Sequence, residues 1–129
     1  KLYINFDMPH VDIDLETRGN SIWFYGNQEE DIEHIAGIVK KFQQERSIVT
    51  NKYSISWGHS SSENIIENSC NSDHCPFVQN GNDIVGSYGG GSWEYHTYLD
   101  DMSRFNEESL SITGGVLGTY AAYRAWGEW

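Results

Sequence analysis

The stretch NQEEDIEHIAGIVKKF, residues 27–42, decides much of the fold, because it carries the clearest helical pattern in the chain. Its apolar residues recur at helical spacing and share one face: Ile32, Ile35, Ile38, Val39 and Phe42. Asn27 is predicted to cap the helix, with Glu30 three residues later as in a capping box. Acidic residues in the first turn and basic residues near the end complement the helix dipole. We therefore expect an amphipathic helix that packs against a sheet.

Two alternating patterns precede this helix and predict strands, because alternation of apolar and polar residues is typical of a half-buried strand. The first consists of Leu2, Ile4 and Phe6. The second consists of Val11, Ile13 and Leu15, which alternate with Asp12, Asp14 and Glu16. Arg18-Gly19-Asn20 is typical of a turn, and residues 22–25 have strong β preference. Residues 11–25 are thus expected to form a hairpin with an acidic outer face.

The rest of the chain predicts a mixture of strands and helices. Strands are expected within residues 47–58 and at residues 83–88 and 92–98, the last two joined as a hairpin by Gly89-Gly90-Gly91. Helices are expected at residues 63–68, 99–110 and 116–126. Residues 1–129 thus predict one α+β domain, a mainly antiparallel sheet of about five or six strands with two or three packed helices.

The charge balance limits the partners. The chain has 19 acidic and 8 basic residues and a net charge of -11, which opposes binding to nucleic acid or to an anionic membrane. Basic proteins, metal ions and neutral sugars are better matched, although the charge can also serve solubility alone. No apolar run is long enough to span a membrane, and two cysteines are too few for a disulfide framework. A cytoplasmic location is therefore expected.

Between Tyr53 and Ser103 there is no Lys or Arg, although the segment is rich in acidic and aromatic residues. This combination is suited to a contact surface with a negative field. The candidate binding residues of the whole chain are acidic: Asp12, Asp14, Glu16, Glu63, Glu67, Asp73, Glu94, Asp100 and Asp101. The loop at residues 59–82 and the acidic edge at Glu94, Asp100 and Asp101 are the first places to expect binding.

The preferred functional hypothesis is a non-catalytic inhibitor that binds a basic protein, such as a nuclease or another nucleic-acid-binding protein, and blocks its basic site. Charge complementarity would speed the encounter and suppress wrong partners. In size and sign the chain resembles toxin immunity proteins and phage-encoded antagonists of host defence, a likeness of class without a family motif. No cofactor, membrane or direct nucleic-acid contact is expected, and the sequence does not indicate an oligomeric state.

Two other classes remain open. A small enzyme, or a domain that binds a metal or another ligand, would use His59, Glu94 and His96, although Glu94 and His96 would share the solvated face of a strand. A carbohydrate-binding module would use the rings of Trp93, Trp126 and Trp129, whose alternative role is in the core.

A metal is not expected. His59, Cys70, His74 and Cys75 lie in one polar loop, but their spacing does not match a structural zinc site. The two cysteines are either free thiols or, in an oxidising compartment, a local disulfide.

Overall fold

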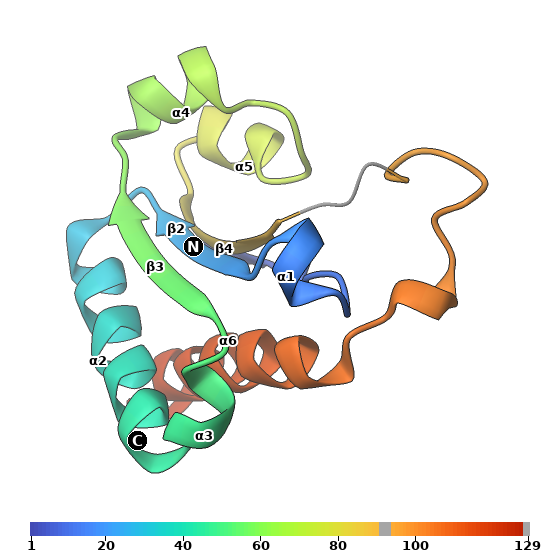
Figure 1. Cartoon of the computed structure of the whole chain (residues 1–129). Coiled ribbons are helices and arrows are strands. Elements are labelled where there is room, and N and C mark those ends of the chain that lie inside the picture. The colour runs from blue at the N-terminus through green and yellow to red at the C-terminus, as the bar shows by residue number, and fades with distance from the viewer. Residues whose placement is uncertain (91–93, 128–129) are drawn as a thin grey trace.

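The computed structural model describes residues 1–90 and 94–127 of the chain and shows an α+β fold (Figure 1). Its sheet contains β1 (Leu2–Asn5), β2 (Ser21–Gly26), β3 (Ser54–His59) and β4 (Asp83–Gly89), in the order β1-β4-β2-β3. The α-helices are α1 (Leu15–Arg18), α2 (Glu29–Glu45), α3 (Ser47–Thr50), α4 (Ser62–Asn68), α5 (Cys75–Gln79) and α6 (Glu107–Trp126). A 3-10 helix, η1 (Met102–Arg104), precedes α6.

The sheet is mixed, so the prediction of a mainly antiparallel sheet with five or six strands was wrong in detail. Among these four strands β2 and β4 pair antiparallel, whereas β1 runs parallel to β4 and β2 runs parallel to β3. The parallel pair β2 and β3 is joined through α2, and parallel neighbours require such a crossover connection. The long amphipathic helix therefore sets the direction of β3.

The predicted hairpin over residues 11–25 is not formed, although its second half is β2. Val11 is fully buried whereas Ile13 is 60% exposed, so the alternating residues do not share one face. Leu15 begins α1 instead of continuing a strand. The short helix and the preceding bend turn Asp12 inward, where it meets a distant arginine rather than solvent.

The predicted strand at residues 92–98 was also wrong over its described part. Residues 94–99 form consecutive turns, while residues 91–93 lie outside the described residues. Of the helix expected at residues 99–110, only the short η1 and the beginning of α6 are formed. The helices predicted at residues 63–68 and 116–126 are confirmed as α4 and α6, and Ser61 caps α4 by accepting a hydrogen bond from the amide of Asn64 at 3.2 Å.

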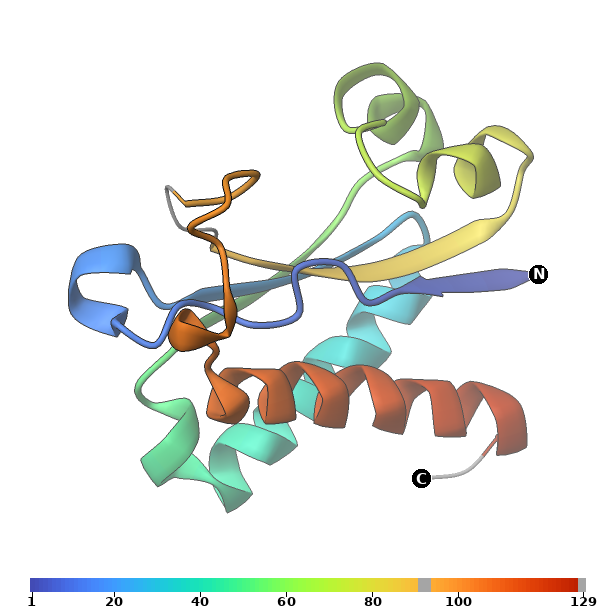
Figure 2. The same ribbon diagram turned by 90° about the vertical axis from the view of Figure 1, so that its right-hand side faces the viewer.

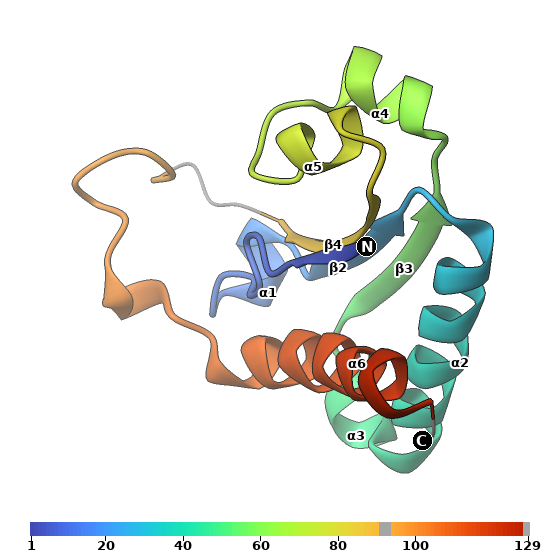
Figure 3. The same ribbon diagram turned by 180° about the vertical axis from the view of Figure 1, so that it is seen from behind.

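Helices cover both faces of the sheet, but unequally (Figure 2). Seen from behind, α6 crosses beneath the sheet next to α2, and α3 follows α2 on the same side (Figure 3). This side holds the larger core, which includes Phe24, Ile35, Val116 and Tyr120. A smaller core lies where α4 and α5 meet the opposite face, around Ile65, Val78 and Ile84.

Asn27 has a different role from the one predicted. The residue before α2 is Gln28, whose side chain makes no capping hydrogen bond. Asn27 is buried and donates hydrogen bonds through Nδ2 to Ser62 Oγ at 3.0 Å and to the carbonyl of Asn82 at 3.1 Å. Its Oδ1 accepts a 2.8 Å bond from the amide of Ile84. Asn27 thus ties β4 and α4 to the end of β2.

Among the described residues, no helix combines the length and apolarity that a membrane span requires.

The contact between α2 and α6 depends on a glycine. A Cβ at Gly115 would lie 2.7 Å from Cε1 of Phe42, whereas a Cβ at the adjacent Gly114 would meet nothing within 4 Å. Glycine in a helix costs about 0.5–1 kcal/mol relative to alanine. Alanine at Gly114 therefore tests helix propensity alone, whereas alanine at Gly115 also tests the packing of α2 against α6.

We predict that Gly114→Ala raises the free energy of unfolding by about 0.5–1 kcal/mol, because it gains helix propensity without a clash. Gly115→Ala must displace the ring of Phe42 and is expected to be less stable than Gly114→Ala by about 1 kcal/mol or more. Urea denaturation of both variants measures the difference. Equal stabilisation by the two substitutions would contradict the close contact of α2 with α6.

Candidate functional site

The candidate site is the segment at residues 95–103, here called the acidic loop, which stands away from the sheet (Figure 1, orange). It exposes four large side chains: Tyr95, Tyr98, Leu99 and Met102. Tyr98 is 92% exposed and Met102 is 74% exposed. The carboxylates of Asp100 and Asp101 stand between them in the sequence and are exposed as well. The loop therefore combines apolar contact area with negative charge.

Local hydrogen bonds give the acidic loop its shape. The amide of Thr97 donates to the carbonyl of Glu94 at 2.9 Å, and the amide of Asp100 donates to the carbonyl of Thr97 at 3.2 Å, which makes two successive turns. Asp101 caps η1, because its Oδ1 accepts a 2.8 Å hydrogen bond from the amide of Ser103. Hydrogen bonding from Ser103 lowers the pKa of Asp101. Its carboxylate is thus ionised at neutral pH.

Both ends of the acidic loop are fixed by a row of four charged side chains, here called the charge chain: Arg18, Glu94, Arg104 and Asp12. Arg18 donates two hydrogen bonds to the carboxylate of Glu94, at 3.2 and 3.0 Å. Arg104 donates two to the carboxylate of Asp12, at 2.5 and 3.0 Å. Nε of Arg104 also lies 4.0 Å from Oε1 of Glu94, which links the two pairs. The charges alternate in sign and sum to zero.

The acidic members of the charge chain are largely removed from water. The side chain of Asp12 is 2% exposed and that of Glu94 is 6% exposed. Burial by itself would raise the pKa of Asp12, but hydrogen bonds from Arg104 and from the amide of Asp14, with the charges of Arg104 and Arg18, outweigh it. The pKa of Asp12 is therefore held below its ordinary value.

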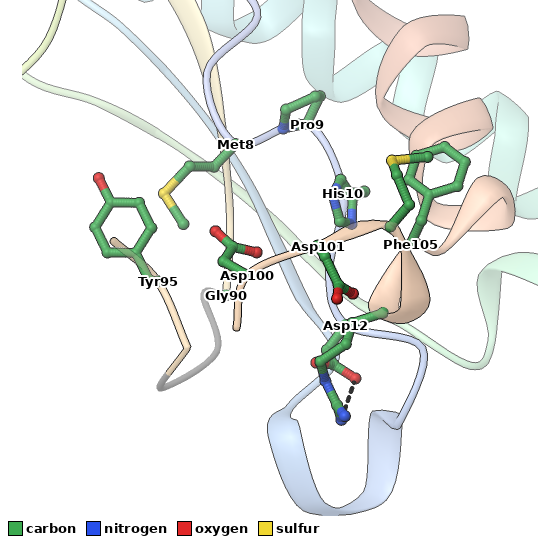
Figure 4. Close-up of a pocket in the computed structure, with 11 residues that line it drawn as sticks. Met8, Pro9, His10, Asp12, Gly90, Tyr95, Asp100, Asp101 and Phe105 are labelled. Carbon is green, nitrogen blue, oxygen red and sulfur yellow. Dashed lines mark hydrogen bonds and ion pairs between the residues drawn. The ribbon is translucent and has the colours of Figure 1, made fainter. Parts of the chain in front are cut away.

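A pocket of about 380 Å³ lies between the acidic loop and the segment at residues 8–12. Figure 4 shows Met8 and Tyr95 towards one side of it, His10 and Phe105 towards the other, and Asp100 and Asp101 between them. The rings of His10 and Phe105 meet edge to face, with centroids 5.2 Å apart. Arg104 also lines the pocket, but it is paired with Asp12, so the carboxylates of Asp100 and Asp101 give the lining a net negative charge. Such a lining, with apolar walls beside it, is suited to a basic side chain of a partner.

Backbone strain is concentrated at this site. Within the described part of the chain, two residues other than glycine have positive φ, Met8 at 41° and His96 at 62°. Met8 lines the pocket, and His96 stacks on Tyr95 with ring centroids 3.7 Å apart. Such residues are rare outside glycine and cluster at binding and active sites. Positive φ thus occurs once in the acidic loop, at His96, and once in the facing wall of the pocket, at Met8.

The structure brings together four of the nine predicted binding residues: Asp12, Glu94, Asp100 and Asp101. Asp12 and Glu94 are buried in ion pairs, so only Asp100 and Asp101 present carboxylates to solvent there. Asp14 and Glu16 are exposed in and just before α1, which carries Arg18. Glu63, Glu67 and Asp73 are exposed in and after α4, on the side of the smaller core. The acidic candidates therefore do not form one surface.

The three residues of the alternative catalytic hypothesis, His59, Glu94 and His96, do not meet in one site. His59 ends β3, which is an edge strand, whereas Glu94 is held by Arg18 and His96 stacks on Tyr95. Neither the pocket at the acidic loop nor a second one at Asp31 and Arg124 is lined by any of the three.

Cys70 and Cys75 form a disulfide with a Cα–Cα distance of 4.9 Å. Of the two alternatives that the sequence leaves open, free thiols or a local disulfide, the structure has the disulfide. Nε2 of His74 lies 2.7 Å from the carbonyl of Ser69. The described residues contain no group of three or more side chains arranged to hold a metal ion.

Comparison with other proteins adds no assignment. No family model, curated protein or solved structure matches the chain.

Sequence reasoning missed the two arginines of the charge chain and the exposed apolar residues of the acidic loop. The sequence pattern places Arg18 in a turn and Arg104 in the helix expected at residues 99–110. One signal was available, because Arg104 is the first basic residue after a long segment without any. Its carboxylate partner Asp12 is 92 residues away, and no local pattern indicates that pairing.

Asp12 provides a test by pH. Because its pKa is lowered in the folded protein, its ionisation stabilises the fold above the unfolded-state pKa of about 3.9, and this contribution is lost as the pH falls through the folded value. We predict that Asp12→Asn is less stable than the wild type at pH 7, and that the difference shrinks when the pH is lowered to about 3. Urea denaturation at both pH values measures it.

Asp100→Asn is the matched control, since Asp100 is exposed in the same loop. Its effect on the free energy of unfolding should stay within about 0.5 kcal/mol. A difference between wild type and Asp12→Asn that is equally large at both pH values would refute an ionic role for Asp12.

Proposed function

We propose that the protein is a non-catalytic inhibitor that inserts its acidic loop into the basic site of a protein that handles nucleic acid, such as a nuclease. The observation that carries the proposal is the exposure of Tyr98 and Met102 beside two carboxylates, on a loop fixed at both ends by ion pairs. The partner is a basic protein, and the nucleic acid itself is not bound.

The exposed side chains support a protein partner. Tyrosine and methionine are enriched in protein interfaces, and tyrosine is frequent among the residues that contribute most to affinity. Tyr98 is 92% exposed, so burial of its ring does not stabilise the fold of the free protein. Burial against a partner would remove this apolar area from water and stabilise the complex.

The fixed loop supports tight binding. Ordering a mobile loop on association costs free energy, so a loop that is already held in place binds more strongly. Glu94 holds the first end of the acidic loop and Arg104 holds the second. The roles of Asp12 and Glu94 in this proposal are therefore to position the loop, whereas Asp100 and Asp101 contact the partner.

The charge distribution supports a basic partner. The charge chain is neutral as a group, so the net charge of -11 is carried by other residues. Exposed carboxylates such as Glu16, Asp100 and Asp101 contribute to the field around the acidic loop. This field would attract a positively charged groove before contact and repel nucleic acid.

The disulfide bears on where the protein acts, which the sequence predicts to be the cytoplasm. The disulfide between Cys70 and Cys75 favours an oxidising compartment, because disulfides are rare in reduced cytosol. An inhibitor of an exported toxin or nuclease is compatible with such a compartment. The cytoplasmic location stays a prediction.

The test is capture of the partner from the native host's extract at about 50 mM and about 500 mM salt, followed by titration of the purified pair. We predict a basic partner whose affinity falls as salt increases. Tyr98→Ala should weaken binding by at least about tenfold, and Asp100→Asn should reduce the salt dependence.

Two controls accompany these variants. Ile48→Ala removes an apolar side chain that is 86% exposed on α3, and Glu63→Gln removes an exposed carboxylate on α4. Both should bind as the wild type does. A partner with an acidic contact site, or wild-type affinity of Tyr98→Ala and Asp100→Asn together, would overturn the proposal.

A further inference from the structure

One face of the sheet is only half covered by helices. Directly paired residues in a sheet point to the same face, and Trp23 pairs with Tyr88 on β4 and with Ser56 on β3. The same face therefore carries these strand residues: Tyr3, Asn5, Ser21, Trp23, Tyr25, Ser54, Ser56, Gly58, Ile84, Gly86 and Tyr88. None of them is charged. Phe24 and Val85 point the other way, into the larger core.

The helices α4 and α5 cover the part of this face nearest to them. Tyr3 stacks on Phe77 of α5 with ring centroids 3.8 Å apart, and Ile84 packs between Ile65 and Val78. Beyond them the strands are open to solvent. We call this uncovered part the open floor, and it consists of Ser21, Trp23, Ser54, Ser56 and Tyr88.

The aromatic rings of this face lie across the sheet instead of standing on it. A Cβ at Gly58 would lie 3.6 Å from the indole of Trp23, so the indole reaches from β2 to β3 and rests against that glycine. A Cβ at Gly86 would lie 2.4 Å from the ring of Tyr25, so Tyr25 occupies space that only glycine leaves. Trp23 remains 41% exposed and Tyr88 remains 48% exposed. Both offer ring surface to a ligand.

The chemistry of the open floor fits a sugar ring. One face of a pyranose is a set of C–H groups that packs on an aromatic ring, and its rim is a set of hydroxyls that exchange hydrogen bonds. The floor supplies two aromatic rings and the hydroxyls of Ser21, Ser54 and Ser56. Bases of a nucleic acid also stack on aromatic rings, but their phosphates require a positively charged groove. Here β3 and β4 belong to a segment without Lys or Arg.

We propose that the open floor binds a neutral oligosaccharide, with Trp23 and Tyr88 as the stacking residues and the serines of β2 and β3 as hydrogen-bonding partners. The ligand lies between α4–α5 and the acidic loop, which stand on the same side of the sheet (Figure 2). The disulfide in the α4–α5 segment favours a compartment outside the cytosol, where glycans are exposed. This site differs from the acidic loop, and it does not depend on the inhibitor proposal.

The test is a titration of the whole chain with short neutral oligosaccharides built from glucose, N-acetylglucosamine, mannose or xylose. Binding is followed by tryptophan fluorescence and by the indole N–H signals in NMR spectra. We predict that at least one sugar binds with a dissociation constant of about 1 mM or tighter and shifts the indole signal of Trp23. Trp23→Ala and Tyr88→Ala should each weaken that binding by about tenfold or more.

Trp126→Ala is the matched control, because Trp126 is 77% exposed but lies on α6, beneath the other face of the sheet. It should bind as the wild type does. Ser56→Arg is a second variant that keeps the core intact, since Ser56 is exposed, and its long side chain should block the floor.

The proposal is overturned if no sugar of the set binds at about 1 mM. It is equally overturned if binding survives both Trp23→Ala and Ser56→Arg. A face used only by a protein partner would give the first of these results.

Discussion

The charge chain is the interaction on which the functional part of the structure depends. It joins side chains that are far apart in sequence, since Arg18 and Glu94 are separated by 76 residues and Asp12 and Arg104 by 92. Removing one partner of a buried ion pair leaves the other charge without compensation, which is strongly destabilising. The four groups must therefore assemble together, and when they do, α1, the acidic loop and the beginning of α6 take fixed relative positions.

Two surfaces of different character lie on one side of the sheet. The acidic loop gathers exposed carboxylates with Tyr98 and Met102, whereas the open floor is uncharged and combines Trp23 and Tyr88 with serine hydroxyls. The open floor is thus uncharged in a strongly acidic chain, and exposed carboxylates gather beside it on the acidic loop. In our account the loop recognises a basic protein and the floor recognises a neutral ligand.

The parts of the fold that follow from local sequence were predictable. The apolar periodicity of residues 32–42 and 116–126 identifies α2 and α6, and β1, β2 and β4 follow from β preference and alternation. The alternation at Val11, Ile13 and Leu15 was misleading, because Asp12 is turned inward by an arginine that lies 92 residues later. The parallel pairing of β3 with β2 is likewise a tertiary property, set by the packing of α2.

The candidate site was predictable only in its composition. The acidic pair at Asp100 and Asp101 is visible in the sequence, and so is the lack of basic residues around it. Which carboxylates face solvent and which are neutralised is decided by tertiary contacts, and Glu94 and Asp12 belong to the second group. The open floor was missed because no local pattern shows which half of a sheet face the helices leave uncovered.

The most direct test of the account is backbone ¹⁵N relaxation of residues 95–103 in the wild type and in Glu94→Gln at neutral pH. If the charge chain fixes the acidic loop, order parameters in the wild type should be about 0.8, and they should fall below about 0.6 in the variant. Equal order parameters in the two proteins, whether high or low, would contradict the claim that the buried ion pairs hold the loop in place.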